Sequence, residues 1–511
     1  MPGETQQFQT YVEEILDALA QHPEREAVVH EDQRITAAEL RDLVYRMARA
    51  LRARGLGRGS TVTLLSGNLP GTIAARYAAN LLGCTINHLY NKLSVEVQAA
   101  IVRDVETTAL VVDPRLAQRA ADLVALAPIS DVLVLGEAKV GDDLLALAAD
   151  QSAEPLASLA RPEDISSIRH TGGTTGHPKG ICSTFAQGVA FRNALELSDA
   201  PERQLACTTL AHAAGHLADH TLAGNGTVVL LDDFDATEVL AAVERERITR
   251  VFVLPPLLYQ LLDHPAAATA DTSSLRNLFY GGCPASPTRL AEAVRRFGPV
   301  LFQAYGQNEA GAISTLSVED HDPERPDRLR SAGKVLADVE VEIRDPEGRA
   351  LPTGELGEIC VRAASVMQGY WKQPELTAEV LRDGWLHTGD LGRLDAEGYL
   401  TVVDRLKDMI IVVGGHVYTT ELEEVLNTHP QVLQSAVFGV PDADRMEQVH
   451  AVVVVAPGST PDERELRELV RQERGAMYEP ARITLTDALP LTDAGKPDKK
   501  LLRRQAEAAA S

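Results

Sequence analysis

The sequence predicts an α/β fold followed by a smaller α+β unit. Helical and extended stretches alternate over most of the 511 residues, which is typical of layered folds with mainly parallel strands. Two later stretches, residues 339–344 and 357–362, instead alternate apolar and polar side chains between Pro and Gly. That pattern indicates a small antiparallel β region. At ~150 residues per domain, the length by itself indicates about three domain-sized units.

The helix–strand alternation is clearest in the first half of the chain. Residues 1–22 are acidic and amphipathic, and residues 36–54 carry apolar side chains at helical spacing until Gly55 breaks the pattern. Residues 70–82 are rich in Ala and are expected to form a further helix. Short apolar runs predict the strands between the helices, at residues 60–65, 110–113, 132–135, 227–231, 250–254 and 278–280.

The character of the chain changes at Asp404-Arg405-Leu406-Lys407-Asp408. Beyond this point we expect strands at 409–413, 436–439 and 449–455 and helices at 420–428 and 462–474. A unit of about 100 residues is large enough to fold independently. We therefore expect two domains, residues 1–404 and residues 405–511.

Composition and charge exclude several classes of protein. Hydrophobic residues make up 45% and charged residues 24%, so the chain can bury large cores and is not disordered as a whole. The 49 Lys and Arg face 73 Asp and Glu, a net charge of −24, which argues against binding of a nucleic-acid polymer. The five cysteines form no C-x-x-C pair, and we find neither a signal peptide nor a membrane-spanning run. We expect a cytoplasmic protein.

One glycine- and threonine-rich loop carries the strongest chemical signal. It reads His170-Thr-Gly-Gly-Thr-Thr-Gly-His-Pro-Lys-Gly180. Glycine lets a backbone approach an anion closely, Thr hydroxyls donate to phosphate oxygens, and Lys179 adds a positive charge. The loop is not a Walker A motif, because no Gly-Lys-Ser/Thr follows at the required spacing. By itself it could also be a surface loop rich in Gly and Thr.

Five further motifs follow in order along the chain: Gly281-Gly-Cys-Pro284, Tyr305-Gly-Gln-Asn-Glu309, Trp385-Leu-His-Thr-Gly-Asp390, Asp404-Arg-Leu-Lys-Asp408 and Pro490-Leu-Thr-Asp-Ala-Gly-Lys496. Together with the loop they resemble the adenylate-forming superfamily, which includes acyl- and aryl-CoA synthetases, luciferases and peptide-synthetase adenylation domains. The resemblance covers nearly the whole chain. It implies a large N-terminal domain with a small, mobile C-terminal cap.

The resemblance assigns an ATP site to residues of these motifs. Tyr305 would stack on adenine, while Asp390 and Arg405 would bind the ribose, since a carboxylate can accept from both hydroxyls. Glu309 would hold Mg²⁺ beside the phosphates, because a carboxylate oxygen suits that ion, with Thr174 as a second candidate ligand. The other nucleotide-binding residues implied are Thr171, Gly172, Gly173, Thr175, Gly176, Lys179, Gly281, Gly282, Cys283, Gly306, Gln307 and Asn308.

The resemblance also assigns residues to catalysis and to domain movement. Lys496 would bridge the substrate carboxylate and the α-phosphate and stabilise charge as the acyl-adenylate forms. Lys407 would be the hinge at which the cap rotates between two half-reactions. Thr174 and His212 are the other catalytic candidates. No enzyme nucleophile is needed, because the acid itself attacks ATP and a thiol then displaces AMP.

The segment His212-Ala-Ala-Gly-His216-Leu-Ala-Asp-His220 allows two interpretations. Three His at four-residue spacing could share a helical face as metal ligands. However, Gly215 should weaken a helix, and His212 with Gly215 matches the His-x-x-Gly of the family near its acyl site. We favour His212 as a gate between acyl pocket and thiol tunnel. The acyl pocket is then expected at His212, Ala213, Gly215, Cys283, Ala304 and Gly306.

The chain departs from the family pattern at several positions. In Val412-Val-Gly-Gly-His416-Val-Tyr-Thr-Thr-Glu421, His416 replaces a usual Asn and Thr419 replaces a usual Pro, and the Gly pair is shifted by one. Gly414, Gly415 and His416 would face the thiol tunnel. Asn308 stands where Thr or Ser is usual, and 332–335 lacks the usual prolines. One half-reaction, adenylation or thiolation, could therefore be altered.

The family implies an ATP-dependent acyl-CoA synthetase with Mg²⁺, ATP and coenzyme A and no tightly bound organic cofactor. The site reads Leu210-Ala-His212 without the acidic residue that amino-acid-activating relatives use, which favours a fatty, aryl or bulky alicyclic acid. No carrier domain follows Lys496. The alternatives are an acyl-AMP ligase that loads a free carrier protein, a non-catalytic nucleotide sensor and a luciferase-type oxidase. A monomer or a homodimer is expected.

Overall fold

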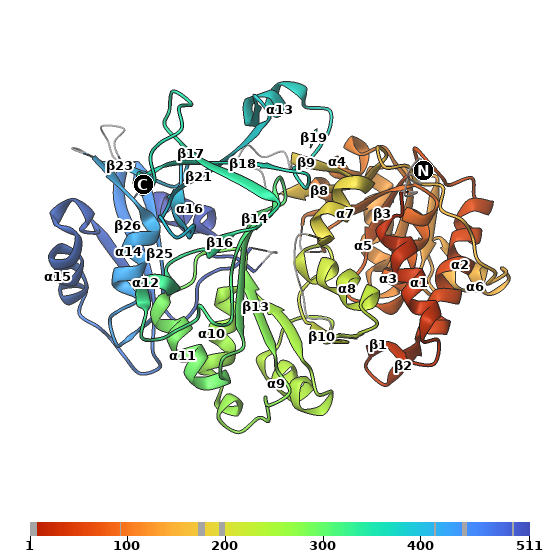
Figure 1. Ribbon diagram of the computed structural model, residues 1–511, viewed down its shortest axis with the longest axis horizontal. Helices are drawn as coiled ribbons and strands as arrows, with labels where there is room; N and C mark the ends of the chain where they lie inside the picture. The colour runs from red at the N-terminus through yellow and green to blue at the C-terminus, as the bar shows by residue number, and fades with distance from the viewer. Residues whose placement is uncertain are drawn as a thin grey trace, which may run out of the picture.

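The computed structural model describes residues 8–91, 93–171, 179–193, 200–412, 415–441, 447–492 and 495–510. Helices and strands alternate along the chain, and the strands of the described residues gather into two large sheets and three smaller ones (Figure 1). The predicted α/β class is thereby confirmed. Most of the expected elements lie within a few residues of the expected bounds.

The first large sheet is built mainly from strands between Thr61 and Thr184. Its strands, in spatial order, are β19 (Gly369–Tyr370), β9 (Lys179–Thr184), β8 (Ile165–Thr171), β4 (Thr85–His88), β3 (Thr61–Leu65), β5 (Thr107–Val112), β6 (Asp131–Val134) and β7 (Asp142–Asp143). The strands from β8 to β7 run parallel, whereas β9 and β19 are antiparallel additions. The sequence that follows β8 is the predicted phosphate loop.

The second large sheet is also parallel in its middle. Its strands are β16 (Lys334–Val335), β15 (Gly311–Leu316), β14 (Leu301–Gln307), β13 (Asn277–Gly281), β12 (Arg250–Val253), β10 (Arg203–Ala206), β11 (Thr227–Leu230), β1 (Glu26–His30) and β2 (Gln33–Thr36). Antiparallel pairs occur only towards its two edges within the described residues. The motifs that begin at Gly281 and Tyr305 therefore lie at the ends of adjacent strands.

A shared hydrophobic core joins the two large sheets. It contains Val28 of β1, Val62 of β3 and the apolar faces of α1 (Tyr11–Gln21), α2 (Ala37–Ala53), α3 (Pro70–Leu81) and α8 (Ala213–Ala223). The remaining helices of this part of the chain are α4 (Val95–Asp104), α5 (Ala117–Leu126), α6 (Leu144–Ala149), α7 (Phe185–Asn193), α9 (Ala236–Arg245), α10 (Pro255–Asp263), α11 (Pro287–Phe297), α12 (Pro326–Leu329) and α13 (Pro374–Val380), with 3₁₀ turns η1 (Pro114–Leu116) and η2 (Pro265–Ala268).

Local sequence explains where these helices begin. In α2 the Thr36 side chain accepts from the backbone of Glu39, and the Glu39 carboxylate accepts in return from the Thr36 backbone. This reciprocal cap satisfies amides that would otherwise lack partners at a helix N-terminus. The helix predicted for residues 36–54 therefore agrees with α2 to within one residue at each end.

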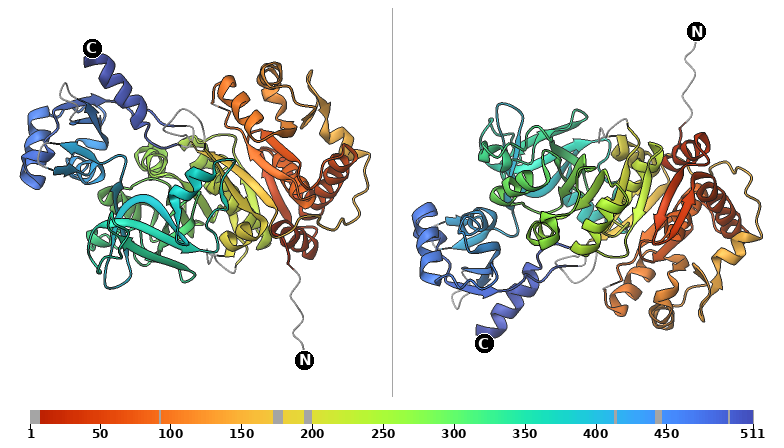
Figure 2. Two further views of the ribbon diagram at one scale, coloured as in Figure 1. Left: turned by 90° about the horizontal axis from the view of Figure 1, so that it is seen from above. Right: turned by 90° about the horizontal axis from the view of Figure 1, so that it is seen from below.

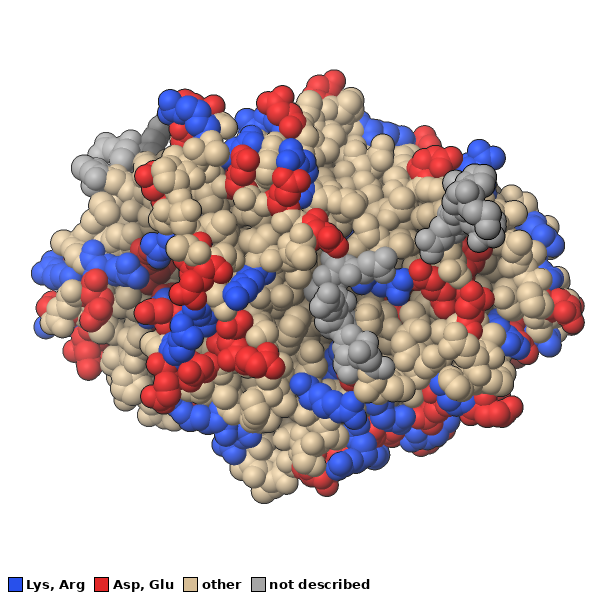
Figure 3. Space-filling model, in the orientation of Figure 1, with Lys and Arg blue, Asp and Glu red and all other residues tan. Residues whose placement is uncertain are grey.

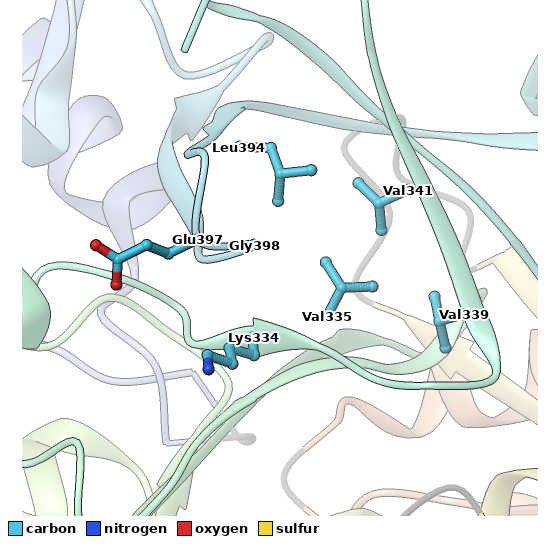
Figure 4. A pocket seen from close by; sticks show the side chains of 7 residues that line it. All are labelled: Lys334, Val335, Val339, Val341, Leu394, Glu397 and Gly398. Carbon is cyan, nitrogen blue, oxygen red and sulfur yellow. The ribbon is translucent and has the colours of Figure 1, made fainter. Parts of the chain in front are cut away.

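The predicted antiparallel β region is confirmed. Its strands are β17 (Val339–Arg344), β18 (Gly357–Ala363), β21 (Trp385–Leu394), β20 (Leu381–Arg382) and β22 (Leu400–Arg405), and every pair is antiparallel. An open pocket of about 380 Å³ lies beside β17, lined by Lys334, Val335, Val339, Val341, Leu394, Glu397 and Gly398 (Figure 4). It contains none of the predicted site residues.

The C-terminal elements lie at one end of the molecule (Figure 2). They are β23 (Ile410–Val412), β24 (Gly415–Val417), α14 (Thr419–Leu426), β25 (Val432–Pro441), β26 (Glu447–Val455), α15 (Glu463–Arg474), η3 (Ala476–Tyr478), β27 (Arg482–Thr486) and α16 (Lys499–Ala510). A hydrophobic cluster from Ile410 to Ile483 belongs to these elements only. The domain bounds 1–404 and 405–511 stay a prediction.

Charge and hydropathy over the described residues agree with the composition. Acidic and basic side chains are interspersed on the visible face of the molecule, without a broad basic surface among the described residues of that face (Figure 3). In the described part of the chain, no helix is both long enough and apolar enough to cross a bilayer.

Candidate active site

Asp390 is the centre of a hydrogen-bonded cluster at the end of β14 and in β21. The Tyr305 hydroxyl donates to Asp390 Oδ2 at 2.7 Å, and Gln307 Nε2 donates to the same oxygen at 2.6 Å. Arg405 pairs with Asp390 across the β21–β22 ladder, and its Nε lies 3.1 Å from Oδ1. Oδ1 is buried and accepts no hydrogen bond from the described residues. It is therefore an acceptor available to the donors of a ligand.

A second layer of contacts fixes the backbone around Asp390. Glu358 accepts from His387 Nδ1 at 2.7 Å and from the Gly389 amide at 3.0 Å. The Thr388 hydroxyl donates to the Ile359 carbonyl at 2.7 Å and accepts from the Asp390 amide at 3.1 Å. Glu358 could not be predicted from the sequence, because it lies about 30 residues before the motif that it supports and only the sheet register brings them together.

Glu309 follows β14 and faces Tyr370, a residue that the motifs did not single out. The Tyr370 hydroxyl donates to Glu309 Oε1 at 3.1 Å, and Lys179 Nζ lies 5.1 Å from the centre of the Tyr370 ring. A half-buried carboxylate with one oxygen in this hydrogen bond fits the oxygen ligation that Mg²⁺ prefers. The predicted phosphate-loop residues Gly172, Gly173, Thr174, Thr175 and Gly176 and the side chain of Thr171 lie outside the described residues.

Lys496 comes from the C-terminal elements and reaches the loop after β13. A Cβ placed on Gly282 would lie 3.7 Å from Lys496 Cε, and Gly282 has a φ of +89°. Burial lowers the pKa of Lys496, whereas Cys283, Asp390 and Glu309 raise it and Arg405 lowers it further. The structure therefore brings Lys496 into the electrostatic environment of residues from three other motifs.

His212 is the residue before α8, where its side chain makes no capping hydrogen bond, and it stacks on Tyr90 with ring centres 4.9 Å apart and planes 15° from parallel. Burial, together with the charges of Arg169 and Lys496, lowers the pKa of His212 to about 4. The imidazole is therefore neutral at pH 7. His216 is also held neutral, because burial and the neighbouring cations place its pKa well below its ordinary value.

Gly215 has a different role from the one that the sequence indicated. It lies inside α8 and does not interrupt the helix. A Cβ at Gly215 would lie 2.0 Å from the Leu210 carbonyl oxygen, so only glycine fits this close approach. Among the described residues, the three-residue groups that could hold a metal are Glu358, Cys360 and His387, and His30, Glu31 and Asp232. The histidines of α8 form no such group with one another.

Close contacts with the backbone also explain why glycine occurs at two other predicted site positions. A Cβ at Gly281 would lie 2.5 Å from the Ala304 carbonyl oxygen, and one at Gly306 would lie 2.2 Å from that of Gly311. Cys283 lies close enough to Lys496 and Glu423 for their charges to act on its thiol, whose buried position raises its pKa to about 12. Of the expected acyl-pocket residues, Cys283, Ala304 and Gly306 thus lie at the ends of β13 and β14, whereas His212, Ala213 and Gly215 lie at the start of α8.

The residues predicted as hinge and thiol tunnel precede α14 in the chain. Lys407 and His416 are exposed. Gly415 packs against Met477, and a Cβ added to Gly415 would lie 2.9 Å from Met477 Sδ. Gly414 lies outside the described residues. Asn308 is half-buried beside Glu309 in the turn between β14 and β15.

Asp404 joins the last strand of the antiparallel region to α14. It accepts from the amide and the hydroxyl of Thr419, and Lys499 Nζ donates to that hydroxyl at 3.0 Å. The amide contact is available because Thr419 stands where the family usually has Pro, which has no N–H. The sequence departure therefore corresponds to a specific contact between the two predicted domains.

The fold and these converging motifs define the class of adenylate-forming enzymes, and comparisons agree. Residues 16–371 match the family model described as AMP-binding enzyme, and residues 421–496 match the AMP-binding enzyme C-terminal domain. The chain belongs to the AMP-binding enzyme family of the adenylate-forming superfamily.

Named relatives cover almost the whole chain. It is 38% identical to the medium/long-chain-fatty-acid–CoA ligase FadD8 of Mycobacterium tuberculosis, over 96% of this chain and 89% of that protein. It is 37% identical to a feruloyl-CoA synthase of an Amycolatopsis species, over 94% and 96%. Among solved structures, the amide bond synthetase McbA from Marinactinospora thermotolerans is 42% identical, with a TM-score of 0.90 over 97% of this chain and 99% of that chain.

Proposed function

We propose that this enzyme is an AMP-forming acid–CoA ligase that activates a carboxylic acid without an amino group. The observation that carries the proposal is the position of Lys496, against Gly282 and within electrostatic reach of Asp390, Arg405 and Glu309. A cation placed between a nucleotide site and an acyl site is suited to stabilise charge as a carboxylate attacks phosphorus. Named CoA ligases among the relatives support this activity.

The residues of the Asp390 cluster would bind the nucleoside. Tyr305 would contact the adenine, and Asp390 Oδ1, which accepts no hydrogen bond from the described residues, would accept from the ribose together with Arg405. Glu309 would hold Mg²⁺, which would neutralise charge on the triphosphate when bound. Lys496 would orient the acid carboxylate and stabilise the negative charge that develops during its attack.

The acyl site favours an acid without an ammonium group. No acidic side chain occurs in 210–215, the turn that leads into α8. His212 is neutral at pH 7 and stacked on Tyr90, so it can border an acyl chain without introducing a charge. A fatty, aryl or alicyclic acid is therefore the expected substrate class, with His212 between the acyl site and the tunnel for the thiol.

The acceptor is proposed to be coenzyme A, as in the named ligases. A second candidate is an amine, which is favoured by the 42% identity to an amide bond synthetase and by the altered segment around His416 and Thr419. A free carrier protein is a third acceptor to be compared. In each case the adenylation half-reaction is the same, and only the displacement of AMP differs.

The test is a panel of acids incubated with ATP and Mg²⁺, with AMP and acyl products measured by mass. Each acid is assayed with coenzyme A, with a carrier protein and with a primary amine. AMP release with thioester formation on coenzyme A supports the proposal. Amide formation without thioester would replace coenzyme A by an amine, and absence of AMP release with every acid would refute adenylation.

A further inference from the structure

Arg169 lies on the face of the first sheet that is opposite to His170. In β8 the side chains alternate, and His170 Nδ1 contacts Asn87 Oδ1 at 3.1 Å on one face. Asn87 of β4 is in register with Ile168, so the next residues, His88 and Arg169, lie beside each other on the other face. Arg169 is half-buried there.

The groups that interact electrostatically with Arg169 include basic and aromatic side chains of β4, of the loop that follows β4 and of the start of α8, together with Asp219. Its charge acts on His88, His212 and His216 and contributes to the low pKa of each imidazole, behind the effect of burial. Tyr90 also interacts electrostatically with Arg169 and stacks on His212. Arg169 therefore lies near Tyr90 and near His212, a residue of the predicted acyl site.

No carboxylate of the described residues pairs with Arg169. The acidic group of this region is Asp219, and both of its oxygens are bound by the Arg76 guanidinium, with the Tyr77 hydroxyl as a further donor. Arg169 itself donates no hydrogen bond and forms no ion pair within the described part of the chain. A half-buried guanidinium without an anionic partner gains a charge-assisted contact when a ligand supplies the negative charge.

His212 relates this cation to the reaction centre. The charges of both Arg169 and Lys496 act on the His212 imidazole, and Tyr90, which stacks on His212, also interacts electrostatically with Arg169. An acid whose reacting carboxylate is at Lys496 and whose chain passes His212 would bring its far end to Arg169. Arg169 would then bind that end through a planar, two-pronged contact, the geometry that matches a carboxylate.

We propose that the substrate is a dicarboxylic acid and that Arg169 binds the carboxylate that does not react. This inference rests on the proposed function and specifies its substrate class. It makes Arg169 a specificity residue of the acyl site, with the neutral histidines His88 and His216 beside it as additional hydrogen-bonding groups. The reaction is unchanged: one carboxylate attacks ATP, pyrophosphate leaves, and the second carboxylate stays ionised.

The test compares matched acids that differ only at the far end. Suitable pairs are adipate and hexanoate, suberate and octanoate, sebacate and decanoate, and 4-carboxycinnamate and 4-methylcinnamate. The assay measures kcat/KM for AMP release by the wild type, Arg169→Met, Arg169→Lys and the exposed control Arg276→Met. For at least one pair we expect the wild type to prefer the diacid about 10- to 100-fold, the range for hydrogen bonds to charged groups.

Arg169→Met should remove this preference, Arg169→Lys should retain part of it, and Arg276→Met should leave it unchanged. Equal losses with diacid and monoacid, or a raised KM for ATP with unchanged acid preference, would overturn the inference and indicate a structural or phosphate-binding role. Circular dichroism and melting temperatures of each variant identify any loss of folding.

Binding without turnover separates this inference from the proposed function. Calorimetry measures the affinity of each diacid for the wild type and for Arg169→Met in the absence of ATP. If no acid supports AMP release, the proposed function fails, and the calorimetry still decides the inference. Diacid binding that depends on Arg169 supports it, whereas binding that is absent, or that is equal in the variant, overturns it.

Discussion

Replacing Asp390 by asparagine should weaken ATP binding by a predictable amount. Oδ2 already accepts from Tyr305 and Gln307, whereas the buried Oδ1, ion-paired with Arg405, accepts no hydrogen bond from the described residues and is the oxygen proposed to meet a ligand donor. An asparagine at this position would lack the negative charge, and its amide group would compete for the same donors. Loss of one charge-assisted hydrogen bond costs about 1.5–3 kcal/mol, which corresponds to an increase in Kd of about 10- to 150-fold.

The assay for this prediction is calorimetric titration of ATP into the wild type, Asp390→Asn and the control Asp338→Asn. Asp338 is an exposed carboxylate in the same part of the chain, so its loss should leave the affinity unchanged. Melting temperatures check that the buried site still folds. If Asp390→Asn binds ATP as tightly as the wild type does, the assignment of the ribose to Asp390 is wrong.

Two further predictions concern stability. Burial raises the pKa of Asp404 from its ordinary 3.8 to about 6; the charge of Glu423 adds to this shift and the charge of Lys499 opposes it. The folded state therefore binds the proton more tightly than the unfolded state does. As pH rises from 4 to 6, the contribution of this carboxyl to stability should fall by up to ~3 kcal/mol. In chemical denaturation, the unfolding free energy of Asp404→Asn minus that of the wild type should rise by up to ~3 kcal/mol between pH 4 and pH 6, and a constant difference would contradict the prediction. Gly215→Ala should destabilise the protein by about 1–3 kcal/mol, as overpacked sites do, because the new methyl group meets the Leu210 carbonyl. Gly188→Ala, also in a helix but with no heavy atom closer than 4.0 Å to the added Cβ, is the control, and equal melting temperatures for the two variants would refute the packing argument.

The fold could be predicted from sequence wherever the signal was local. Helical spacing over residues 36–54 matches α2, and alternation over 339–344 matches β17. Gly215 shows where local reasoning fails. Helix propensity predicts a weakened helix there, yet the requirement for glycine comes from contact with Leu210 in the turn before α8, and intrinsic propensity is overridden by such packing.

The candidate site was predictable where its residues fall in contiguous motifs. Asp390, Arg405, Glu309 and Lys496 all follow from such motifs, and the structure brings them into one electrostatic environment. The supporting residues Glu358 and Tyr370 could not be predicted, because neither lies within a motif. Arg169 and Tyr90 were missed for the same reason.

Their proximity is set by the β4–β8 register and by the loop that follows β4. No spacing in the sequence carries that information. The position of Arg169 beside His88 follows only from the pairing of β4 with β8.

The central claim is that the enzyme catalyses two half-reactions and that Lys496 acts in the first. A comparison of Lys496→Ala with the wild type tests this claim most directly. Pyrophosphate exchange reports adenylation, and acyl transfer to coenzyme A from a supplied acyl-adenylate reports the second step. Removal of a charge that stabilises a transition state costs about 100- to 1,000-fold, and we predict at least this loss in exchange with acyl transfer largely retained. Equal losses in both steps, or unchanged pyrophosphate exchange, would contradict the account.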